Sequence, residues 1–450
     1  MICIAGVAVW VAAPSAARVL AISLLTLAFA LVTLVRVFAL WQFMRPTSVR
    51  DRDVNYAVPE DALPPYTLLV PLYREAGVAA GLVSAMQALD YPKGQLEIFF
   101  LTETDDNGTR AALAASGLAD HMHVITVPDG EPRTKPRALN YGLTFARGEF
   151  VAIFDAEDVP DPGQLRAAVA AFRSAGFETA CVQARLSIYN PGQNVLTRQF
   201  TLEYAALFDG ILPALDRLGL PLPLGGTSNH FRRCDLERAG AWDPFNVTED
   251  ADLGVRLARL QKRVAMLDSV TWEEAPDTFT AWFSQRTRWI KGWMQTYLVH
   301  MRSPVQLWRE LGPWKFLGFH LIVGGLILSA LAHPLFYAAV LTSTLDGTFL
   351  SWPVDGPDAV LWLTCCFNAA ASYFCSLALI ALAVARRGGR LLVRSALGLP
   401  FYWLAISLAS YKAFAEIVTR PHYWAKTPHK GIGRETLTAP IDPDGEGRVL

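Results

Sequence analysis

The sequence has little charge for its length. Charged residues make up 18% of the 450 positions, hydrophobic residues make up 52%, and the formal net charge is −1. Globular domains carry about 25% charged residues, so this chain is too apolar to be wholly soluble. Its near-zero net charge gives no basis for nucleic-acid binding.

Cysteines are few and lack metal-ligand spacing. The six cysteines include no C-x-x-C pair, which argues against a zinc or redox motif. Three of them (Cys365, Cys366 and Cys375) fall in one apolar segment, as expected of buried thiols. We therefore expect neither a disulfide framework nor a zinc site.

Two common nucleotide-binding motifs are missing. No G-x-G-x-x-G follows the first predicted strand, and no G-x-x-x-x-G-K-[ST] occurs. These absences argue against a dinucleotide-binding domain and against a P-loop NTPase.

Apolar residues are instead concentrated at the two ends of the chain. Residues 19–41 are almost wholly apolar, with Arg36 as the single charge, and a membrane-spanning helix needs about 20 such residues. Arg45, Arg50 and Arg52 follow, so the positive-inside rule places this end of the helix in the cytoplasm. A cleavable signal peptide is the alternative, but the apolar run is too long and lacks a small-residue cleavage site.

Three further apolar segments follow residue 314. They cover residues 316–345, 359–385 and 391–417, and each is long enough to cross a bilayer. The basic and aromatic segment 420–430 suits a cytoplasmic interface. Three simple crossings would leave that segment on the far side of the membrane. We therefore expect either one re-entrant segment or a hairpin in the first, which His333-Pro334 interrupts. Residues 1–13 are also apolar but too short for a clear span.

The middle of the chain alternates short apolar runs with amphipathic segments. Strands are predicted at residues 66–71, 96–101 and 122–127, and helices at 78–89 and 136–147. Repeated β-α-β units indicate a parallel sheet with right-handed crossovers. The expected fold class is α/β, with a Rossmann-like nucleotide-binding domain inserted between transmembrane helices.

The most informative stretch is residues 149–162. Its apolar run, residues 150–154, predicts a buried strand that ends on Asp155, Glu157 and Asp158. Ligands of α/β sheets bind beyond the carboxyl ends of the strands. Three neighbouring acids there favour a hard, phosphate-binding cation, Mg²⁺ or Mn²⁺. An acidic turn that caps the next helix is the alternative.

Other charged residues surround this position in the predicted fold. The second strand ends on Glu103, Asp105 and Asp106. Basic residues precede the helix at 136–147, where they could meet phosphate oxygens near its N-terminus: Arg133, Lys135 and Arg137. A solvated surface loop is the alternative interpretation of these basic residues.

Taken in order, these motifs resemble those of the family-2 glycosyltransferases. More narrowly, they resemble the membrane-embedded processive type that includes cellulose synthase, hyaluronan synthase and bacterial β-glucan synthases. The resemblance covers residues 60–300 and rests on five stretches: 102–106 (nucleobase and ribose), 135–140 (diphosphate), 155–158 (D-x-D metal motif), Thr248-Glu249-Asp250 (T-E-D) and 285–289 (Q-x-x-R-W).

The resemblance implies a glycosyltransferase A-type domain and a set of roles. It assigns the metal to Asp155 first, with Glu157 and Asp158 competing for the second place. It assigns donor binding to the following residues: Glu103 (with Asp105 and Asp106 as rivals), Lys135, Asp155 and Arg288.

The chemistry of sugar transfer requires a base as well as a metal. Breaking the anomeric C–O bond leaves negative charge on a diphosphate, which a divalent cation stabilises. The attacking hydroxyl must lose a proton to a carboxylate, and Asp250 is our candidate, with Glu249 as the alternative. A single displacement inverts the anomeric centre. A second interpretation of Thr248 is a helix cap with acids in the first turn, which is compatible with this role.

Acceptor contacts are expected from two places. Gln285, Arg288 and Trp289 share one helix face, where arginine suits a diphosphate and tryptophan a sugar ring. An amphipathic helix on the membrane is the alternative. Gly226 and Thr227 lie in a glycine loop that would let an acceptor approach the backbone closely, although the loop could equally be a simple turn.

We therefore expect an inverting, processive β-glycosyltransferase of the inner membrane. Its UDP-sugar donor, glucose by resemblance, would extend a glycan acceptor into an extracellular polysaccharide, with an export partner. The alternatives are a single transfer to a lipid acceptor and, more remotely, an inactive scaffold or transporter. The expected parts are a membrane segment (1–45), a cytoplasmic catalytic domain (60–275), interface helices (276–314), membrane helices in the bilayer (315–418) and a partly disordered cytoplasmic tail (419–450).

Overall fold

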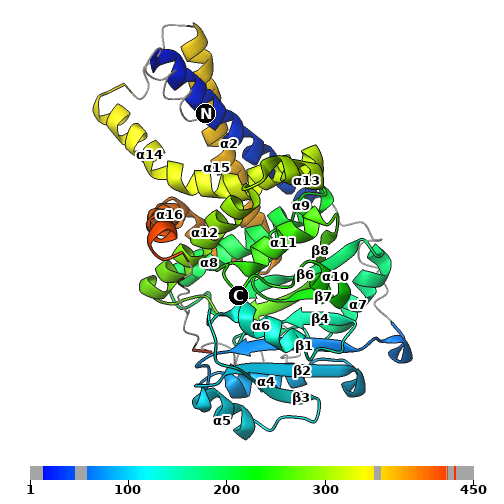
Figure 1. Ribbon diagram of the computed structural model, residues 1–450. Helices are drawn as coiled ribbons and strands as arrows, with labels where there is room; N and C mark the ends of the chain where they lie inside the picture. Colours follow the sequence, from blue (N-terminus) through cyan, green and yellow to red (C-terminus); the bar gives the residue numbers. More distant parts are fainter. Residues whose placement is uncertain (1–13, 46–57, 349–355, 422, 424–429, 432–450) are drawn as a thin grey trace.

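A computed structural model describes residues 14–45, 58–348, 356–421, 423 and 430–431 (Figure 1). The apolar residues 1–13 and the tail expected to be disordered lie outside these described ranges. Within them, the chain forms an α/β domain from which long helices project.

The domain is built on one eight-stranded sheet. Its strands lie in the order β3-β2-β1-β4-β7-β6-β8-β5. Their bounds are β1 Tyr66–Leu72, β2 Leu96–Glu103, β3 Met122–Val127, β4 Phe150–Ile153, β5 Val159–Pro160, β6 Thr179–Ile188, β7 Asn229–Arg232 and β8 Arg263–Glu273. The first three predicted strands and the central strand are confirmed.

The sheet is mixed and not parallel throughout. β1 pairs in parallel with β2 and β4, and β2 with β3. β7 runs antiparallel to both β4 and β6, and β5 runs antiparallel to β8. β6 pairs in parallel with β8. The expectation of a parallel sheet is therefore correct for β1 to β4 and for the pair of β6 with β8, and wrong at β7 and β5.

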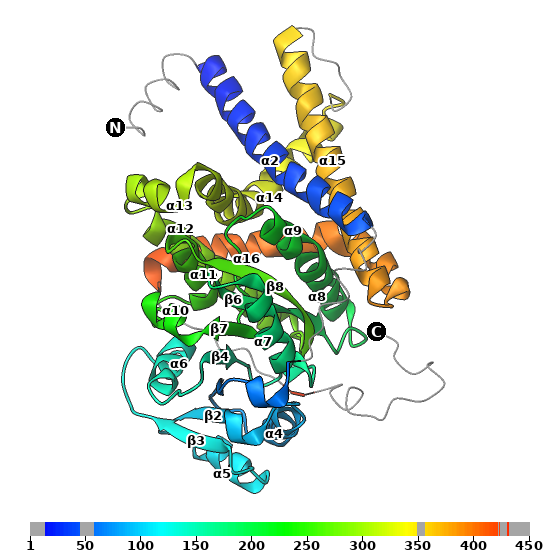
Figure 2. The same cartoon turned by 90° about the vertical axis from the view of Figure 1, so that its right-hand side faces the viewer.

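Helices cover both faces of this sheet (Figures 1 and 2). They are α4 Ala79–Gln87, α5 Asn107–Ala115, α6 Lys135–Leu143, α7 Gln164–Ala175, α8 Val195–Ala206, α9 Leu212–Arg217, α10 Arg233–Arg238 and α11 Glu249–Arg259. Side chains of one strand alternate between two cores: Leu69 faces one core, and Leu68 and Val70 face the other. Strands buried on both faces read as continuous apolar runs, which explains why these strands were visible in the sequence.

Two more helices join the domain to the apolar segments. α12 spans Phe279–His300 and α13 spans Pro304–Phe319. Leu307 and Leu311 of α13 pack with Val255 and Ala258 of α11, so α13 lies against the domain. A kink at Gly312, whose φ is +73°, bends α13 before the chain continues outward.

Among the residues that the structure describes, four segments are long and apolar enough to cross a membrane: Val19–Met44, Pro304–Leu345, Ala359–Arg386 and Leu392–Thr419. They correspond to α2 (Pro14–Met44), α13 with α14 (Gly325–Leu345), α15 (Gly356–Arg386) and α16 (Leu399–Thr419). Of the described cysteines, Cys181 and Cys375 are buried, whereas Cys234 and Cys366 are exposed. The prediction of buried thiols is therefore only partly correct.

The four apolar helices do not share one direction. α2, α14 and α15 project away from the sheet, whereas α16 lies across the domain beside α12 (Figures 1 and 2). Ile290 and Met294 of α12 pack with Ala409 and Ala413 of α16. Beyond α16, Lys430 donates to Glu274 and Asp277 of the domain. The chain after α16 thus returns to the domain, and α14 continues through Pro334 as one helix without a hairpin.

Candidate active site

Three predicted residues from distant parts of the chain meet at the carboxyl end of β4. Lys135, at the start of α6, donates from Nζ to Asp155 Oδ1 at 2.5 Å and to the Gly226 carbonyl at 2.7 Å. A Cβ on Gly226 would lie 3.4 Å from Asp250 Oδ2 and 3.9 Å from Asp155 Oδ2. The structure thus brings the expected donor lysine, metal ligand and base around one glycine.

Lys135 is held in its charged form by the surrounding acids. Burial alone would lower the pKa of Lys135, but the charges of Asp155 and Glu249 outweigh it and raise that pKa. Among the described residues, Arg137 instead pairs with Glu103 at 2.8 Å, and Arg133 pairs with Asp105 at 2.9 Å. Of the three basic residues expected here, Lys135 is thus the one that contacts Asp155.

The two candidate bases differ in exposure. Glu249 and Asp250 both stand in the first turn of α11, but Glu249 is buried and Asp250 is partly exposed. Burial, together with the charge of Asp250, raises the pKa of Glu249 to about 7. Asp250 accepts a 2.8 Å hydrogen bond from the Ala251 amide. Asp250 thus presents the more accessible carboxylate.

Thr248 does not cap α11. The predicted helix start and the acids of its first turn are confirmed, but the Thr248 side chain makes no capping hydrogen bond. Thr248 packs instead against α12, where a Cβ on Gly292 would lie only 2.3 Å from Thr248 Oγ1. The close approach of α12 therefore fixes the start of α11, including Asp250.

One carboxylate of the acidic loop after β4 already accepts hydrogen bonds from within the protein. Asp158 is fully buried; its Oδ2 accepts a 2.6 Å hydrogen bond from the Asp155 amide and another from the Thr227 hydroxyl. Asp158 therefore shapes the loop that presents Asp155. Thr227 is also buried, which argues against its predicted contact with an acceptor.

The remaining acids fit a divalent cation by their chemistry. Burial and the charge of Asp155 raise the pKa of Glu157 well above its usual range, and Glu273 of β8 lies close enough to be affected by Asp155, Glu157 and Asp158. Carboxylate oxygens suit Mg²⁺ or Mn²⁺. No group of three possible ligands surrounds a single point among the described residues. Asp155 and Glu157 would supply carboxylate oxygens to a Mg²⁺ or Mn²⁺ ion that binds together with a phosphate.

The acids after β2 divide into different roles. Asp106 accepts from the Thr109 amide at 3.1 Å and from the Arg74 amide at 2.5 Å, so it caps α5. Glu103 is buried against Arg137, whereas Asp105 remains exposed. Asp106 thus has a structural role at the start of α5, and the donor contacts of Glu103, Asp105 and Asp106 stay predictions.

α12 places its predicted residues on both sides of the helix. Arg288 lies near Glu249, Asp250 and Asp155, whose charges oppose the lowering of its pKa by burial. Trp289 is partly buried against Phe200 and Tyr204, with ring centroids 6.0 and 6.5 Å away.

Two further side chains of α12 are buried. Gln285 Oε1 has no hydrogen-bond partner within the described part of the chain. Arg286 points away from the site and binds Glu203 of α8 at 2.7 Å.

Sequence reasoning missed several residues that shape the site. Gln183 of β6 accepts from the Gly225 amide at 2.9 Å and donates to the Thr227 carbonyl at 3.0 Å. Asn229 donates to the Gly225 carbonyl at 2.6 Å. A glutamine inside a buried strand was the available signal, since buried polar groups need partners.

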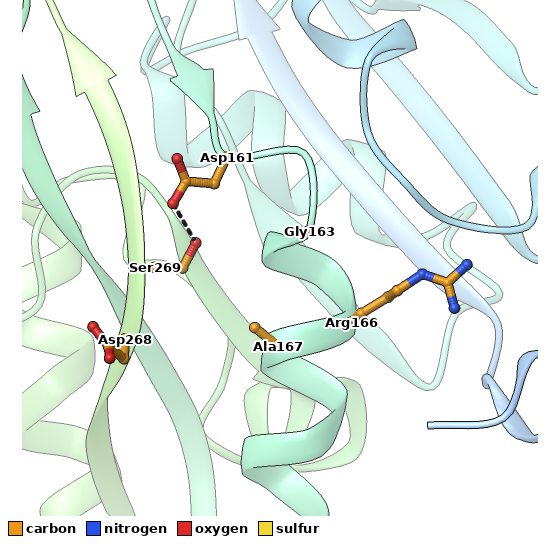
Figure 3. Close-up of a pocket in the computed structure, with 6 residues that line it drawn as sticks. All are labelled: Asp161, Gly163, Arg166, Ala167, Asp268 and Ser269. Carbon is orange, nitrogen blue, oxygen red and sulfur yellow. Dashed lines mark hydrogen bonds between the residues drawn. The ribbon is translucent and has the colours of Figure 1, made fainter. Parts of the chain in front are cut away.

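A separate cavity of about 320 Å³ lies between α7 and β8 (Figure 3). Its acids are already bound: Asp161 accepts from Ser269 Oγ at 3.2 Å and from the Val270 amide at 2.8 Å, and Asp268 pairs with Arg185. None of its lining residues was predicted as a site residue. We assign it no chemistry.

Comparison with known proteins supports the fold and the family. A probable glycosyltransferase, YdaM, of Bacillus subtilis is 27% identical over 51% of this chain and 55% of its own length. A β-monoglucosyldiacylglycerol synthase of Synechocystis is 28% identical over 62% of this chain and 61% of its own length. The chain therefore matches little more than half of the length of these curated relatives.

A solved structure has the same fold at low sequence identity. A mannosyltransferase from Pyrobaculum calidifontis, determined with GDP-Man and Mn²⁺, is 19% identical with a TM-score of 0.53, over 89% of this chain and 97% of that one. The model of the glycosyltransferase-like family 2 matches residues 64–292. With half of its length covered by that model and a glycosyltransferase A-like fold, the chain belongs to glycosyltransferase family 2.

Proposed function

We propose that this protein is an inverting glycosyltransferase that uses a nucleotide-diphosphate sugar, with UDP-glucose as the expected donor. The observation that carries the proposal is the meeting of Lys135, Asp155 and Asp250 around Gly226. A cation at the start of α6, an acid after the carboxyl end of β4 and an acid in the first turn of α11 provide the charges that such a reaction requires.

The donor diphosphate would bind between Lys135 and Arg288. Both cations lie beside Asp155, and both are held in a largely buried site where ionic hydrogen bonds are strong. Asp155 and Glu157 would hold Mg²⁺ or Mn²⁺, which stabilises negative charge on the leaving diphosphate.

Asp250 would accept the proton of the attacking hydroxyl. It is partly exposed beside Gly226, and the Ala251 amide holds one of its oxygens, Oδ1, which leaves Oδ2 to face the acceptor. A well-placed general base typically contributes about 10²- to 10⁴-fold in rate.

For the acceptor, our first proposal is a growing β-linked glycan. Trp289 is partly exposed beside Arg288 and would offer its ring to a sugar of the acceptor, whereas Gln285 is buried. The projecting helices α2, α14 and α15 adjoin this side of the domain (Figure 2). The product would leave through an inner membrane, with the domain in the cytoplasm and a partner for export.

A single transfer to a lipid hydroxyl is the second candidate. The curated relatives from Synechocystis and from two further cyanobacteria carry the name β-monoglucosyldiacylglycerol synthase. α16, which packs along α12, would place a lipid acceptor near Trp289.

The test uses membranes that carry the full chain, with Mg²⁺ or Mn²⁺ and a panel of radiolabelled nucleotide sugars. Ethanol-insoluble label of high molecular weight would support the polymer, whereas label in the organic phase as a single-sugar lipid would support the second candidate. Excess EDTA should abolish either product, and added Mn²⁺ should restore it. Membranes that transfer no sugar from any donor would overturn the proposal, as would full activity of Asp250→Asn.

A further inference from the structure

A second cluster of polar and aromatic residues lies outside the catalytic domain, where the projecting helices meet α16. It takes at least one side chain from each of four helices: Arg36 from α2, His333 and Tyr337 from α14, Ser372 and Tyr373 from α15, and Trp403 from α16. The mechanism above uses none of these residues.

The cluster is compact. The Tyr337 and Tyr373 hydroxyls lie 2.8 Å apart, and the ring of His333 lies 5.9 Å from Trp403 and 6.3 Å from Tyr373. Trp403 in turn lies 5.2 Å from Tyr373. These contacts join α14, α15 and α16 outside the catalytic domain (Figure 1).

Arg36 differs from the other polar residues between α2 and α15. Thr33 donates to Asn368 Oδ1 at 2.9 Å, and Asn368 donates to the Thr26 carbonyl at 3.2 Å, so these neutral groups satisfy one another. Arg36 donates to Ser372 Oγ. Within the described ranges it forms no ion pair with a carboxylate.

An arginine without an acidic partner is costly in this position. Arg36 lies inside the candidate span Val19–Met44, about 12 Å along the helix from Met44 at about 1.5 Å per residue. A guanidinium has five N–H donors, and one serine hydroxyl neither neutralises its charge nor uses all of them. Ionisable residues in a membrane segment are expensive and usually mark a functional site.

The position of Arg36 favours a phosphate as its missing partner. Trp41 and Arg45 stack at 3.6 Å near the end of α2, as expected at a membrane interface. Arg36 thus stands just inside the leaflet on the domain side, within reach of a lipid phosphate drawn toward it by local thinning of the bilayer. Arginine binds phosphate oxygens bidentately.

We propose that Arg36 binds the phosphate of an anionic membrane lipid, with Ser372 beside it and the aromatic side chains of α14, α15 and α16 covering the lipid's glycerol region. This site goes beyond the proposed function, because it lies on the membrane side of α16 and contains none of the transfer residues. Tyr402, next to Trp403, faces the domain and donates to Glu203 at 2.7 Å. α16 therefore separates the lipid site from the active site.

The test measures lipid binding and not sugar transfer. The full chain, purified in mild detergent, is analysed by native mass spectrometry for bound lipid after addition of phosphatidylglycerol or phosphatidylcholine. Wild type should retain phosphatidylglycerol in preference, and Arg36→Gln should weaken this retention about tenfold or more. Arg36→Lys, which keeps the charge but loses the bidentate geometry, should fall between them.

Arg386→Gln is the matched control, since it removes the same charge at the end of a membrane helix, where Arg386 contacts Phe43. It should keep the wild-type preference. Displacement of the bound phosphatidylglycerol by a polyprenyl phosphate would support a lipid-phosphate site, whereas displacement by inorganic phosphate would overturn it. Equal retention by wild type and Arg36→Gln would also overturn it. If Arg36→Gln does not fold, the lack of a phosphatidylglycerol preference in wild type would still refute the proposal.

Discussion

The proposed donor side and the proposed acceptor side of the candidate site are built in different ways. Donor residues follow strands of one sheet: Asp155 comes two residues after β4, and Glu103 ends β2. The acceptor side depends on contacts between distant helices, such as Trp282 with Tyr402 and Arg286 with Glu203. Local sequence therefore specifies the first side, whereas the packing of the whole chain specifies the second.

Asp250 stands where the two sides meet, so its loss should have the largest effect. We expect Asp250→Asn to lower kcat about 10²- to 10⁴-fold and to leave donor binding nearly unchanged, because the amide keeps the shape but cannot accept the proton. Steady-state kinetics and a donor-binding titration measure the two quantities. Asp268→Asn, a change to an acid outside the site, is the control. A kcat close to that of wild type would rule out Asp250 as the base.

Gly292 tests whether the acceptor-side helix positions the base. A Cβ at residue 292 would lie 2.3 Å from Thr248 Oγ1, so Gly292→Ala should push the start of α11 away from α12. A displacement of about 1 Å can cost about 10²-fold in rate. Gly163→Ala is the matched control, since a Cβ at residue 163 would have no other atom within 4 Å. Equal activity of the two variants would show that α12 does not position Asp250.

The ion pair between α12 and α16 allows the packing of the proposed acceptor side to be tested by itself. Lys291 is 1% exposed and pairs with Glu416 at 3.1 Å. Lys291→Met should destabilise the protein by about 1–3 kcal/mol, because Glu416 keeps only its 3.8 Å contact with Lys412 and the carbonyls of Arg420 and Tyr423 lose their donor. Lys291→Met with Glu416→Gln should recover part of this loss, and thermal unfolding of the single and double variants gives the coupling. Strictly additive effects would exclude the pairing.

The smallest expected effect is a change of thermal stability with pH, which depends on Glu249. The raised pKa of Glu249, about 7, means that the folded protein holds its proton more tightly than the unfolded chain. Stability is therefore lost as pH rises from about 4.5 to 7. Glu249→Gln removes this penalty, so its Tm should exceed that of wild type by a few degrees above pH 7 and match it near pH 4. Parallel Tm curves for the two proteins would show that Glu249 ionises normally.

Sequence reasoning succeeded where a local rule was sufficient. A buried strand followed by acids predicted the position of Asp155, and a helix start after a basic loop predicted that of Lys135, while their roles stay predictions. It could not predict contacts between distant residues: Thr227 donates to Asp158, and Asp106 accepts from the Arg74 amide as well as from its own helix. Glu273 was missed because only β8 pairing beside β6 brings it to the acids.

The direction of α16 could not be predicted for a different reason. Its composition is that of a membrane span, and its apolar side chains can be buried equally well in lipid or against protein. Only contacts such as Met294 with Ala409 show that it lies across the domain. Composition predicts that a segment is apolar, but the partners available in the folded chain decide which way it runs.

The pairing of α2 with α15 also has a consequence for biosynthesis. Thr33 and Asn368 are separated by 335 residues. At roughly 5–20 residues per second, the ribosome needs roughly 20–70 s to make the second helix after the first. During that interval Thr33 and Arg36 of α2 lack their α15 partners, Asn368 and Ser372. Ala39 and Phe43 of the same helix can already pack against α8 and α9 of the domain, so the two ends of α2 are completed at different times.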